Sequence, residues 1–505
     1  MNKVSENSKL RLKYLGIDTY QESVLYMRKD CHVCKAEGFE AQTRILVECK
    51  GKSIIATLNT INTDLLKDDE ASLSAYAWSF LGASEGDKIN LSHPPSLKSL
   101  KYVRSKIYGS SFSKAQLTSI IQDIVHGRYS DIQISMFLTA CAGVGLNINE
   151  ILHLAEAMID SGQRIEWPSP IVVDKHCIGG LPGNRTTLIV VPIIAEFGLT
   201  IPKTSSRAIT SPAGTADTME VFSQVNLNLQ KMRKVVEQEN GCIIWGGSVF
   251  LSPADDTLIH IERGMDLDTE GQMVASILSK KVAAGSNHIV IDVPVGPSAK
   301  IRSVQKAEAL RNYLQIIGLQ LGVEVKVIFT DGSQPVGRGV GPALEAAEVL
   351  SVLTCDKEAP ADLRSRALLL ASEILEFSKK VPKGKGLQMA NEILDSGRAL
   401  KKFEAICKAQ GGMTLPGKAP YTHVVAAKSH GYVDYIDNRR LAKIAKLAGA
   451  PQAKTAGLYL QTALHARIEK GEPLFTIHAE SKGELSYAVS YLKSEKPIYE
   501  IREHQ

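Results

Sequence analysis

The sequence predicts an α/β protein in which a helical domain accompanies a mixed α/β domain with a largely parallel central sheet. A β-rich N-terminal domain and an α+β C-terminal lobe complete this fold class. Its 505 residues suffice for two to four domains, and a hydrophobic content of 44% supplies sizeable cores. Strand-like and helical runs alternate after residue 169, which is typical of βαβ units, and short β-type runs crowd the first 95 residues.

Changes in these patterns predict the domain boundaries. We expect the β-rich domain over 1–95, because His93-Pro94-Pro95 interrupts helix and strand alike. The helical domain takes 96–168 and is completed by a later excursion at about 255–285. The α/β domain takes 169–254 and 286–417, and the C-terminal lobe takes 418–505.

Within the helical domain, three capping-box patterns predict helix starts. Each pairs a serine or asparagine with a Gln or Glu three residues later: Ser113 with Gln116, Ser130 with Gln133, and Asn147 with Glu150. Apolar residues recur at helical spacing after the first of them, from Leu117 to Val125. The region therefore reads as a small bundle of helices.

Runs of β-branched and other apolar residues predict the remaining elements. Strands are expected at 45–47, 53–58, 171–173, 242–247, 289–293, 323–329, 424–427, 431–433 and 471–477. Helices are expected at 188–197, 273–281 and 304–321, with further helix starts at 252–256 and near Gly337, Gly339 and Gly341. The spacing of these three glycines fits no nucleotide-binding fingerprint.

Composition excludes several classes of function. A net charge of +5, from 59 basic and 54 acidic residues, is too balanced for a nucleic-acid binder. The N-terminus has no apolar segment and no run is long enough to span a bilayer, so we expect a soluble, cytoplasmic protein. Eight scattered cysteines indicate a reducing compartment. Cys31 and Cys34 form a lone C-x-x-C that we interpret as a turn, and we expect no metal site.

One stretch, 170–220, carries the chemistry. A strand at 171–173 precedes Lys175 and a turn rich in glycine (Gly179, Gly180 and Gly183), after which a helix runs to Phe197. Backbone N–H groups and the positive end of that helix would face one small space, which suits an anion. A second loop from Ser205 to Asp217 is crowded with hydroxyls and holds one cation, Arg207. Two such loops are able to bind one oxyanion from both sides. The alternative interpretation of the glycine-rich segment is a tight strand-to-helix turn in which Lys175 is solvated.

The whole string resembles a known signature. Asp174-Lys175-His176 with Gly179-Gly180, followed by Ser205-x-Arg207 and the segment 213–220, resembles the thymidine and pyrimidine-nucleoside phosphorylases. Cys177 and the segments 182–185 and 211–213 are similar to the AMP phosphorylase group, which also carries an extra N-terminal domain. The resemblance covers about residues 95–480. It implies domain closure and a homodimer or larger homo-oligomer.

The resemblance also implies roles for individual residues. Phosphate ligands match Lys175, Thr186, Thr187, Ser205 and Thr215, whereas Cys177 departs from the serine of thymidine phosphorylases. Lys175, His176 and Asp268 are the catalytic candidates. His176 suits proton movement, or is a loop histidine bonded to backbone. Asp268 matches the proton donor to the leaving purine; its alternative is an ionised residue at a helix N-terminus.

Contacts to the nucleoside or nucleotide are implied in the same way. They match Gly180, Ser206, Arg207, Ala208, Ile209, Thr210, Ser211, Thr215, Ser276, Lys280 and Lys300. Ser276 and Lys280 would hold the base, although the accompanying arginine has no counterpart in register and Arg263 is shifted. Lys300 would supply charge for a 5′-phosphate, or is a solvated surface lysine.

The predicted function is phosphorolysis of an N-glycosidic bond in a nucleoside or nucleoside 5′-monophosphate. Thymidine and AMP are the contending substrates, inorganic phosphate is the co-substrate, and no cofactor, nucleic acid or membrane is expected. Two alternatives come from other classes. One is a transferase resembling anthranilate phosphoribosyltransferase, which would depend on Mg²⁺ and pyrophosphate. The other is a nucleotide-binding protein without catalysis.

Overall fold

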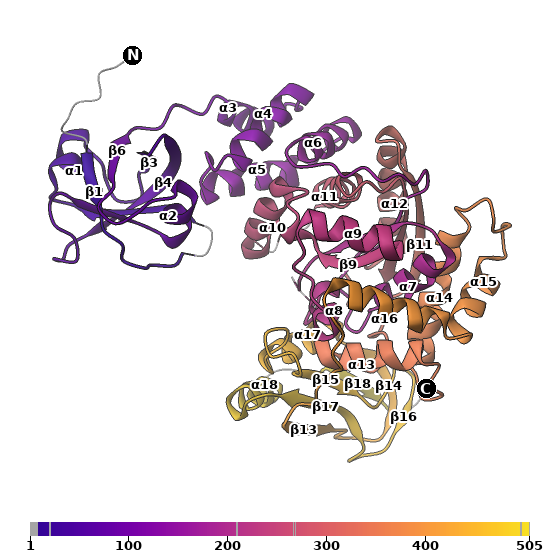
Figure 1. Cartoon of the computed structure of the whole chain (residues 1–505). Helices are drawn as coiled ribbons and strands as arrows, with labels where there is room; N and C mark the ends of the chain where they lie inside the picture. The colour runs from indigo at the N-terminus through magenta and orange to yellow at the C-terminus, as the bar shows by residue number, and fades with distance from the viewer. Residues whose placement is uncertain are drawn as a thin grey trace. The chain divides into compact units, whose positions relative to one another are not determined.

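A computed structural model describes residues 9–19, 22–208, 211–265, 267, 269–494 and 497–503 of the chain (Figure 1). The chain divides into two units: Met1–Tyr108 with Gln122–Phe137, and Gly109–Ile121 with Leu138–Gln505. The predicted fold class is confirmed by the elements described below. The residue boundaries of the four predicted domains stay a prediction.

The first unit contains a closed six-stranded β-barrel. Its strands are β1 Lys9–Leu12, β2 Val24–Arg28, β3 Arg44–Cys49, β4 Lys52–Ile61, β5 Glu70–Leu73 and β6 Lys88–Ser92, in the order β1-β5-β2-β4-β3-β6. Alternate residues of the strands, such as Ile45 and Val47 of β3, are buried inside it. Helices α1 His32–Glu37, α2 Ala75–Leu81 and α3 Leu100–Ile107 accompany the barrel. The predicted β-rich N-terminal region is thereby confirmed.

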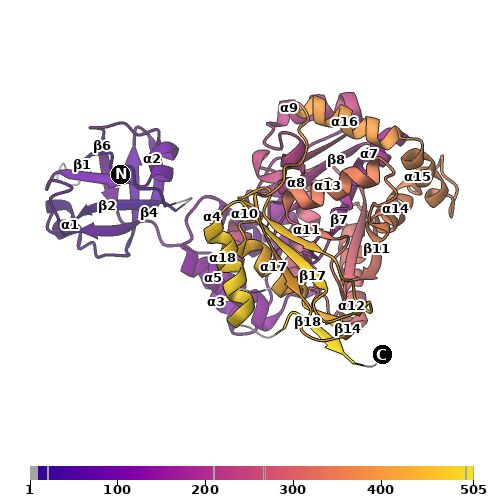
Figure 2. The same ribbon diagram turned by 90° about the horizontal axis from the view of Figure 1, so that it is seen from below.

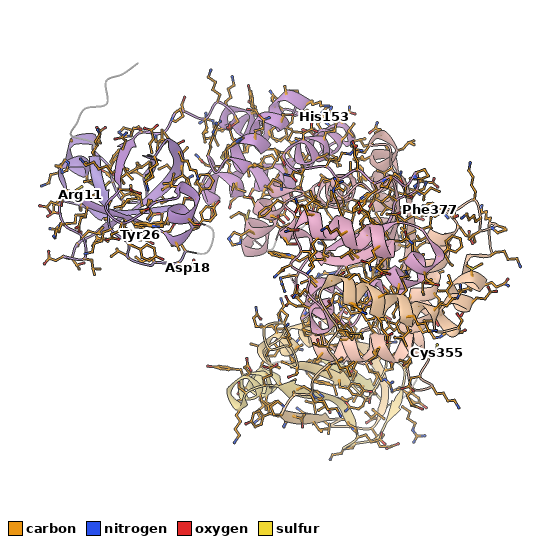
Figure 3. The ribbon with its side chains drawn as sticks, viewed as in Figure 1. Arg11, Asp18, Tyr26, His153, Cys355 and Phe377 are labelled. Atoms are coloured by element: carbon orange, nitrogen blue, oxygen red, sulfur yellow. The ribbon has the colours of Figure 1, made fainter. Side chains whose placement is uncertain are left out.

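The C-x-x-C segment is not the turn that we predicted. Cys31 is the N-cap of α1, and its sulfur accepts a hydrogen bond of 3.3 Å from the backbone N–H of Cys34. Gly38 ends the helix with φ +65°, a conformation that glycine adopts without strain. Burial raises the pKa of both thiols. Cys355 is by contrast an exposed thiol (Figure 3).

The helical region begins its helices where the capping boxes predicted. Helices α4 Lys114–Val125, α5 Asp131–Val144 and α6 Ile148–Asp160 each follow one reciprocal pair of side-chain-to-backbone hydrogen bonds. In the third, the Asn147 N–H donates to Glu150 at 2.9 Å and the Glu150 N–H donates to Asn147 at 3.0 Å. Local sequence therefore fixes these starts.

A parallel sheet forms the centre of the second unit (Figure 2). Strands β11 Glu324–Asp331, β10 His288–Val295 and β7 Val173–Cys177 pair in that order, and β8 Ile201–Ser205 pairs with β9 Gly241–Trp245, all parallel. A parallel bridge between Val172 and Thr200 links the two groups. The predicted parallel arrangement is confirmed. The strand expected at 171–173 instead begins at Val173 and ends at Cys177, because the polar residues after Val173 pair with β10, Lys175 opposite Val290.

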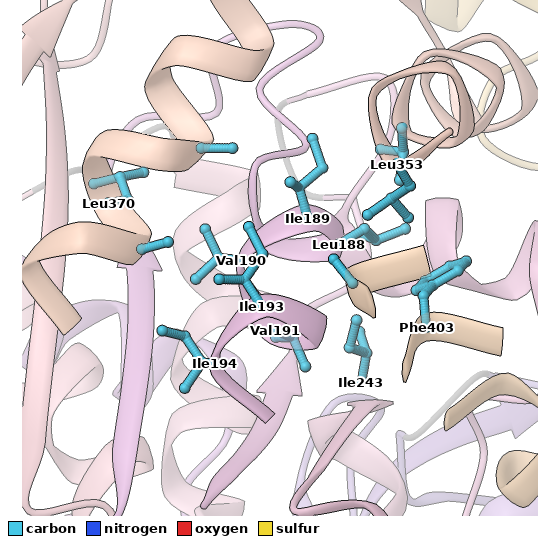
Figure 4. Packing of buried hydrophobic residues seen from close by; sticks show 14 of the residues in the cluster. Leu188, Ile189, Val190, Val191, Ile193, Ile194, Ile243, Leu353, Leu370 and Phe403 are labelled. Atoms are coloured by element: carbon cyan, nitrogen blue, oxygen red, sulfur yellow. The ribbon is translucent and has the colours of Figure 1, made fainter. Parts of the chain in front are cut away.

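Helices of the second unit pack on the sheet and on one another. They are α7 Thr187–Phe197, α8 Thr215–Phe222, α9 Leu229–Glu239, α10 Pro253–Met265, α11 Glu270–Ala283, α12 Val304–Gln320, α13 Pro342–Leu353, α14 Ala361–Leu375, α15 Gly386–Asp395 and α16 Arg398–Gln410, with a 3₁₀ turn at Gly246–Ser248. Helix α7 is buried from Thr187 to Ala195 and packs against residues such as Leu370 of α14 and Phe403 of α16 (Figure 4). Helix α11 lies along α6.

The C-terminal part of the chain adds two small sheets and two helices. The sheets are β12 Gly339–Val340, β15 Gly457–Leu460, β17 Pro473–Ala479 and β13 Tyr421–Ala426 in that order, and β16 Arg467–Ile468, β14 Gly431–Ile436 and β18 Tyr499–Arg502. The helices are α17 Asn438–Leu447 and α18 Lys482–Ser494. As predicted, the glycine-rich segment starts a helix: Gly341 caps α13 with φ +122°. Across the described residues, no helix is both long and apolar enough to cross a membrane.

Candidate active site

Lys175 is a buried ammonium at the centre of the candidate site. Its Nζ donates hydrogen bonds to Thr186 Oγ1 at 2.7 Å and Thr187 Oγ1 at 3.5 Å, and its side chain is among the largest that are fully buried. Burial lowers the pKa of Lys175 because the charged form loses water. Among the described residues no carboxylate lies within ion-pair distance of it. A buried cation held by hydroxyls is a suitable partner for an anion.

The glycine-rich turn brings backbone close to that ammonium. Gly179, Gly180 and Gly183 have φ of +119°, +55° and +74°, which favour glycine. A Cβ on Gly183 would lie 2.0 Å from the carbonyl oxygen of Val336, so the turn packs directly on the next loop. Helix α7 begins immediately after it, with its N-terminal end near Lys175. This matches the strand, glycine loop and helix order that the sequence predicted.

Ser205 is the last residue of β8, which lies beside β7. A parallel bridge joins Val172 and Thr200, the residues that directly precede these two strands. The Ser205 hydroxyl is buried and has no hydrogen-bond partner in the described part of the chain. Such a hydroxyl is costly unless a ligand satisfies it.

Thr215 is the first residue of α8, directly after the second loop. A Cβ on the preceding Gly214 would lie 2.6 Å from the carbonyl oxygen of Ser206, so the two ends of this loop touch. Thr215 is half-buried. Both predicted loops therefore end at a helix N-terminus.

A buried ion pair that sequence reasoning missed joins the two loops. Arg185, from the first loop, pairs through Nε with Glu345 of α13, and its Nη2 donates 2.6 Å to the carbonyl of Ala213 in the second loop. Glu345 also accepts from Thr218 Oγ1 at 3.1 Å and from the Gly341 N–H at 3.1 Å. Arg185 and Glu345 lie 160 residues apart in the chain, so no local signal reveals the pair.

Arg207 already has acidic partners. Its guanidinium pairs with Glu220 at 2.8 Å and Asp217 at 3.2 Å, and it stacks over the Trp245 ring at 5.2 Å. Hydrogen bonds to Glu220 raise the pKa of Arg207. Its positive charge is therefore offset within the loop, and its contact with a nucleotide stays a prediction.

Other predicted contacts in this loop are spread over its surface and interior. Ser206 is exposed, and the N–H of half-buried Ala208 donates to Asp217 at 2.6 Å. Ser211 is buried and its hydroxyl donates to the Ala213 carbonyl at 2.8 Å. Ile209, Thr210 and Asp268 lie outside the described residues, so their predicted roles stay predictions.

His176 lies within β7 and not in a loop, and alternation along the strand turns it to the opposite face from Lys175. Burial lowers its pKa well below 6.5, and the ammonium groups of Lys281 and Lys203 lower it further. The imidazole is therefore neutral at pH 7. It is suited to donating or accepting a hydrogen bond.

Cys177 occupies a position where the family pattern has a serine. Its sulfur accepts a hydrogen bond of 3.0 Å from Asn184 Nδ2. Asn184 also donates a hydrogen bond of 3.1 Å to the buried carboxylate of Asp292. Burial, followed by the Asp292 charge, raises the Cys177 pKa to about 12. The thiol is a neutral, weak donor at any ordinary pH.

The predicted base contacts lie together on α11. Lys280 Nζ donates to Ser276 Oγ at 3.0 Å and pairs with Asp255 of α10 at 2.6 Å. The described residues do not include the side chain of Arg263. Lys300 is half-buried beside the glycine turn, since a Cβ on Gly179 would lie 3.2 Å from Lys300 Cβ. The structure thus places Lys300 next to the predicted contact Gly180.

No group of three or more His, Cys, Asp or Glu side chains suited to a metal ion occurs among the residues that the structure describes. The site is built from ammonium, hydroxyl and backbone groups.

Comparison with solved structures and family models defines the class of protein. The fold is similar to anthranilate phosphoribosyltransferase (TrpD) from Thermus thermophilus, with a TM-score of 0.51 at 19% identity over 61% of this chain and 98% of that one. Residues 100–162 match the glycosyl transferase family helical bundle domain, and residues 169–400 match its α/β domain. Residues 432–499 match the pyrimidine nucleoside phosphorylase C-terminal domain. These matches define a glycosyl transferase.

Full-length relatives then give the particular family. A protein of Legionella pneumophila strain Philadelphia 1 named "Putative thymidine phosphorylase" is 60% identical over 495 residues, 98% of this chain and 96% of that protein. "Putative thymidine phosphorylase 2" of Acidovorax sp. strain JS42 is 55% identical over 97% of this chain and 95% of that protein. The chain belongs to the thymidine phosphorylase family.

Proposed function

We propose that this protein cleaves the N-glycosidic bond of a nucleoside or nucleoside 5′-monophosphate with inorganic phosphate. A phosphate oxygen bonds to C1′ of the sugar, the C1′–N bond breaks, and its electron pair goes to the base, which takes up a proton. The products are a free base and a pentose 1-phosphate. The observation that carries the proposal is the buried Lys175 ammonium held by two threonine hydroxyls. The neighbouring strand β8 ends at Ser205, whose buried hydroxyl has no hydrogen-bond partner among the described residues.

Phosphate binding in this proposal uses both loops. Lys175 supplies the charge, while the hydroxyls of Thr186, Thr187, Ser205 and Thr215 and the helix N-termini supply donors. The Arg185–Glu345 pair holds the loops at a fixed separation. Positioning the phosphate beside the sugar accounts for much of the acceleration, because it makes the attack effectively unimolecular.

The leaving base is stabilised from α11 in this scheme. Ser276 and Lys280 hold its polar edge, with Lys280 oriented by Asp255. Neutral His176 donates a hydrogen bond to an oxygen that gains charge as the bond breaks. Asp268 is proposed as the proton donor to a purine base. No cofactor enters the reaction, and we propose a homodimer or larger homo-oligomer as the working form.

Two substrates remain in competition within this proposal. The printed names of the relatives favour thymidine. Lys300 beside Gly179 favours a nucleoside monophosphate, because an ammonium at that position suits a 5′-phosphate. AMP is the monophosphate proposed first, on the Cys177 motif.

Release of free base tests the proposal. Thymidine, AMP, CMP and UMP would each be incubated with and without inorganic phosphate, using wild type, Lys175→Met and Lys402→Met. Lys402 is a matched control because it pairs with Glu239 at 3.1 Å in α9, outside the site. We expect base release that requires phosphate, is lost in Lys175→Met and is retained in Lys402→Met. Release without phosphate, or unchanged in Lys175→Met, would overturn the proposal.

The same assay separates the substrates and the competing class. Turnover of a monophosphate with thymidine inert assigns Lys300 to the 5′-phosphate, whereas turnover of thymidine alone assigns the nucleoside reaction. A parallel reaction with anthranilate, Mg²⁺ and phosphoribosyl pyrophosphate covers the transferase whose fold this chain shares. Product from that mixture alone would replace phosphorolysis as the function.

A further inference from the structure

A second buried charge cluster lies on the other side of β7 and takes no part in the proposed reaction as described so far. The Asp174 carboxylate accepts from Lys203 Nζ of β8 at 3.0 Å and from Lys281 Nζ of α11 at 2.8 Å. The side chains of Asp174, Lys203 and Lys281 are 0%, 5% and 3% exposed. Lys281 also donates to the Thr204 carbonyl at 3.4 Å.

When both lysines are protonated, the cluster carries one positive charge more than it balances. Burial lowers the pKa of Lys281 to about 7, so this excess charge is partly relieved near neutral pH. Two ammonium groups face one carboxylate, and neither has a second acidic partner among the residues that the structure describes. Burying an unbalanced charge is costly unless an anion from elsewhere completes it. Asp174 stays ionised here: burial alone would raise its pKa, but Lys203 and Lys281 outweigh that effect and lower it.

The position of the cluster indicates where such an anion would bind. Asp174 is adjacent to Lys175 and shares its face of β7 with His176, and Lys203 lies two residues before Ser205 on β8. Ser205 is 8% exposed, and its hydroxyl has no hydrogen-bond partner among the residues that the structure describes. Alternation along β8 puts Lys203 and Ser205 on one face of the strand, so the cluster adjoins the hydroxyl that is proposed to bind phosphate.

We propose that Lys203 and Lys281, tied together by Asp174, are positioning residues whose positive charge is completed by the phosphate dianion and sets the electrostatic surroundings of His176. This inference rests on the proposed function. The lysines do not touch the reacting atoms; they act through Ser205 and His176. Water screens charges only weakly inside a protein, so one positive charge near the bound phosphate changes the affinity for phosphate measurably.

Other charged groups near His176 do not replace the cluster. Lys280 of α11 also lies near the imidazole but is paired with Asp255 of α10, and Lys175 of β7 faces the other side of the strand. Lys281 and Lys203 repel the imidazolium more strongly than either, after burial itself. Removing one of them is therefore the informative change.

Charge restoration separates this role from simple structural support. Lys203→Met leaves Lys281 and Asp174 as a neutral pair, and Lys203→Met with Asp174→Asn restores the single excess charge while removing more contacts. We expect Lys203→Met to raise the KM for phosphate about tenfold, a ratio that represents the same free-energy change as one pKa unit. The value of kcat should change less than threefold. The double variant should return to within threefold of wild type.

The second readout needs no turnover. The imidazole of His176 would be titrated by NMR in histidine-labelled protein, with His176→Gln for assignment and Lys402→Met as the control lysine. Its pKa should rise by about one unit in Lys203→Met and fall again in the double variant. If Lys203→Met fails to fold, the variant Lys281→Gln, which also removes one positive charge from the cluster, would be measured in its place.

A double variant that is more impaired than Lys203→Met in both readouts would overturn the inference and leave the cluster a structural tie between β7, β8 and α11. Failure of the proposed function has a different signature. Wild type would then show no phosphate-dependent base release, while the imidazole titration and the binding of inorganic phosphate by calorimetry would still decide whether the cluster acts as described.

Discussion

Replacing Arg185 by methionine would remove the guanidinium that joins the two candidate phosphate loops. Arg185 is 7% exposed and Glu345 is 1% exposed, so their ion pair is inside the protein. After the change, Glu345 would keep the Thr218 hydroxyl and the Gly341 N–H as donors but would lose its cationic partner. The Ala213 carbonyl would lose its donor as well.

The expected cost follows from that loss. Removing one partner of a buried ion pair costs about 3–5 kcal/mol, because an uncompensated charge stays inside. Arg185→Met with Glu345→Met removes both charges, so its cost should be well below the sum of the two single changes. A positive coupling of about 2 kcal/mol or more in this double-mutant cycle is the prediction.

Urea unfolding followed by tryptophan fluorescence would measure these free energies, because Trp245 stacks on Arg207 of the second loop. Kinetics would add a functional readout: in a variant that still folds, loss of the tie should raise the KM for phosphate more than it lowers kcat. A loss below about 1 kcal/mol for Arg185→Met, or additive single changes, would refute the reasoning. Arg467→Met, which breaks an exposed pair with Glu469 at 3.0 Å, should cost about 1 kcal/mol or less.

Three further predictions use single substitutions. Lys175→Met should lower the rate of phosphate-dependent base release at least about a hundredfold. Its circular dichroism spectrum should stay unchanged, and Lys402→Met should keep its activity. Gly183→Ala should lower the free energy of unfolding by more than about 2 kcal/mol, since it combines φ +74° with a 2.0 Å clash against Val336. Gly198→Ala, strained at φ +98° but with open space, should lose less. Burial raises the pKa of Glu348 to about 7 from 4.5, so its protonation stabilises the folded state below pH 4.5 and that contribution is lost as pH rises through 7. Glu348→Gln should therefore gain about 3 kcal/mol relative to wild type between pH 4.5 and about 8 in urea titrations, and a pH-independent difference would contradict this.

Elements whose signal is local were predictable from sequence. The three capping boxes at Ser113, Ser130 and Asn147 form the expected hydrogen bonds. Helix α7 begins at Thr187, one residue before the expected start, and ends at Phe197 as expected. These features depend on residues within a few positions of one another, so their physics is complete in the local sequence.

Features that depend on distant residues were not predictable. Asp174, Lys175 and His176 look like a polar loop, yet pairing with β10 makes them part of a strand in which Asp174 and Lys175 are buried and His176 is half-buried. Burial of Asp174 is possible because partners arrive from elsewhere, such as Lys281, which lies 107 residues after Asp174 in the chain. Sequence pattern identifies polar residues but does not reveal which partners will offset the cost of burying them.

The extension of β7 has a functional consequence that a loop would not have. Alternation along a strand sends Lys175 toward the α7 N-terminus and Asp174 and His176 toward α11, so one short segment serves the proposed phosphate on one face and the proposed base on the other. A loop would let these side chains reorient, whereas pairing with β10 fixes their spacing. Inserting one residue into β7 would reverse every side chain beyond it. Such an insertion after Asp174 should therefore eliminate phosphate binding even in a protein that still folds.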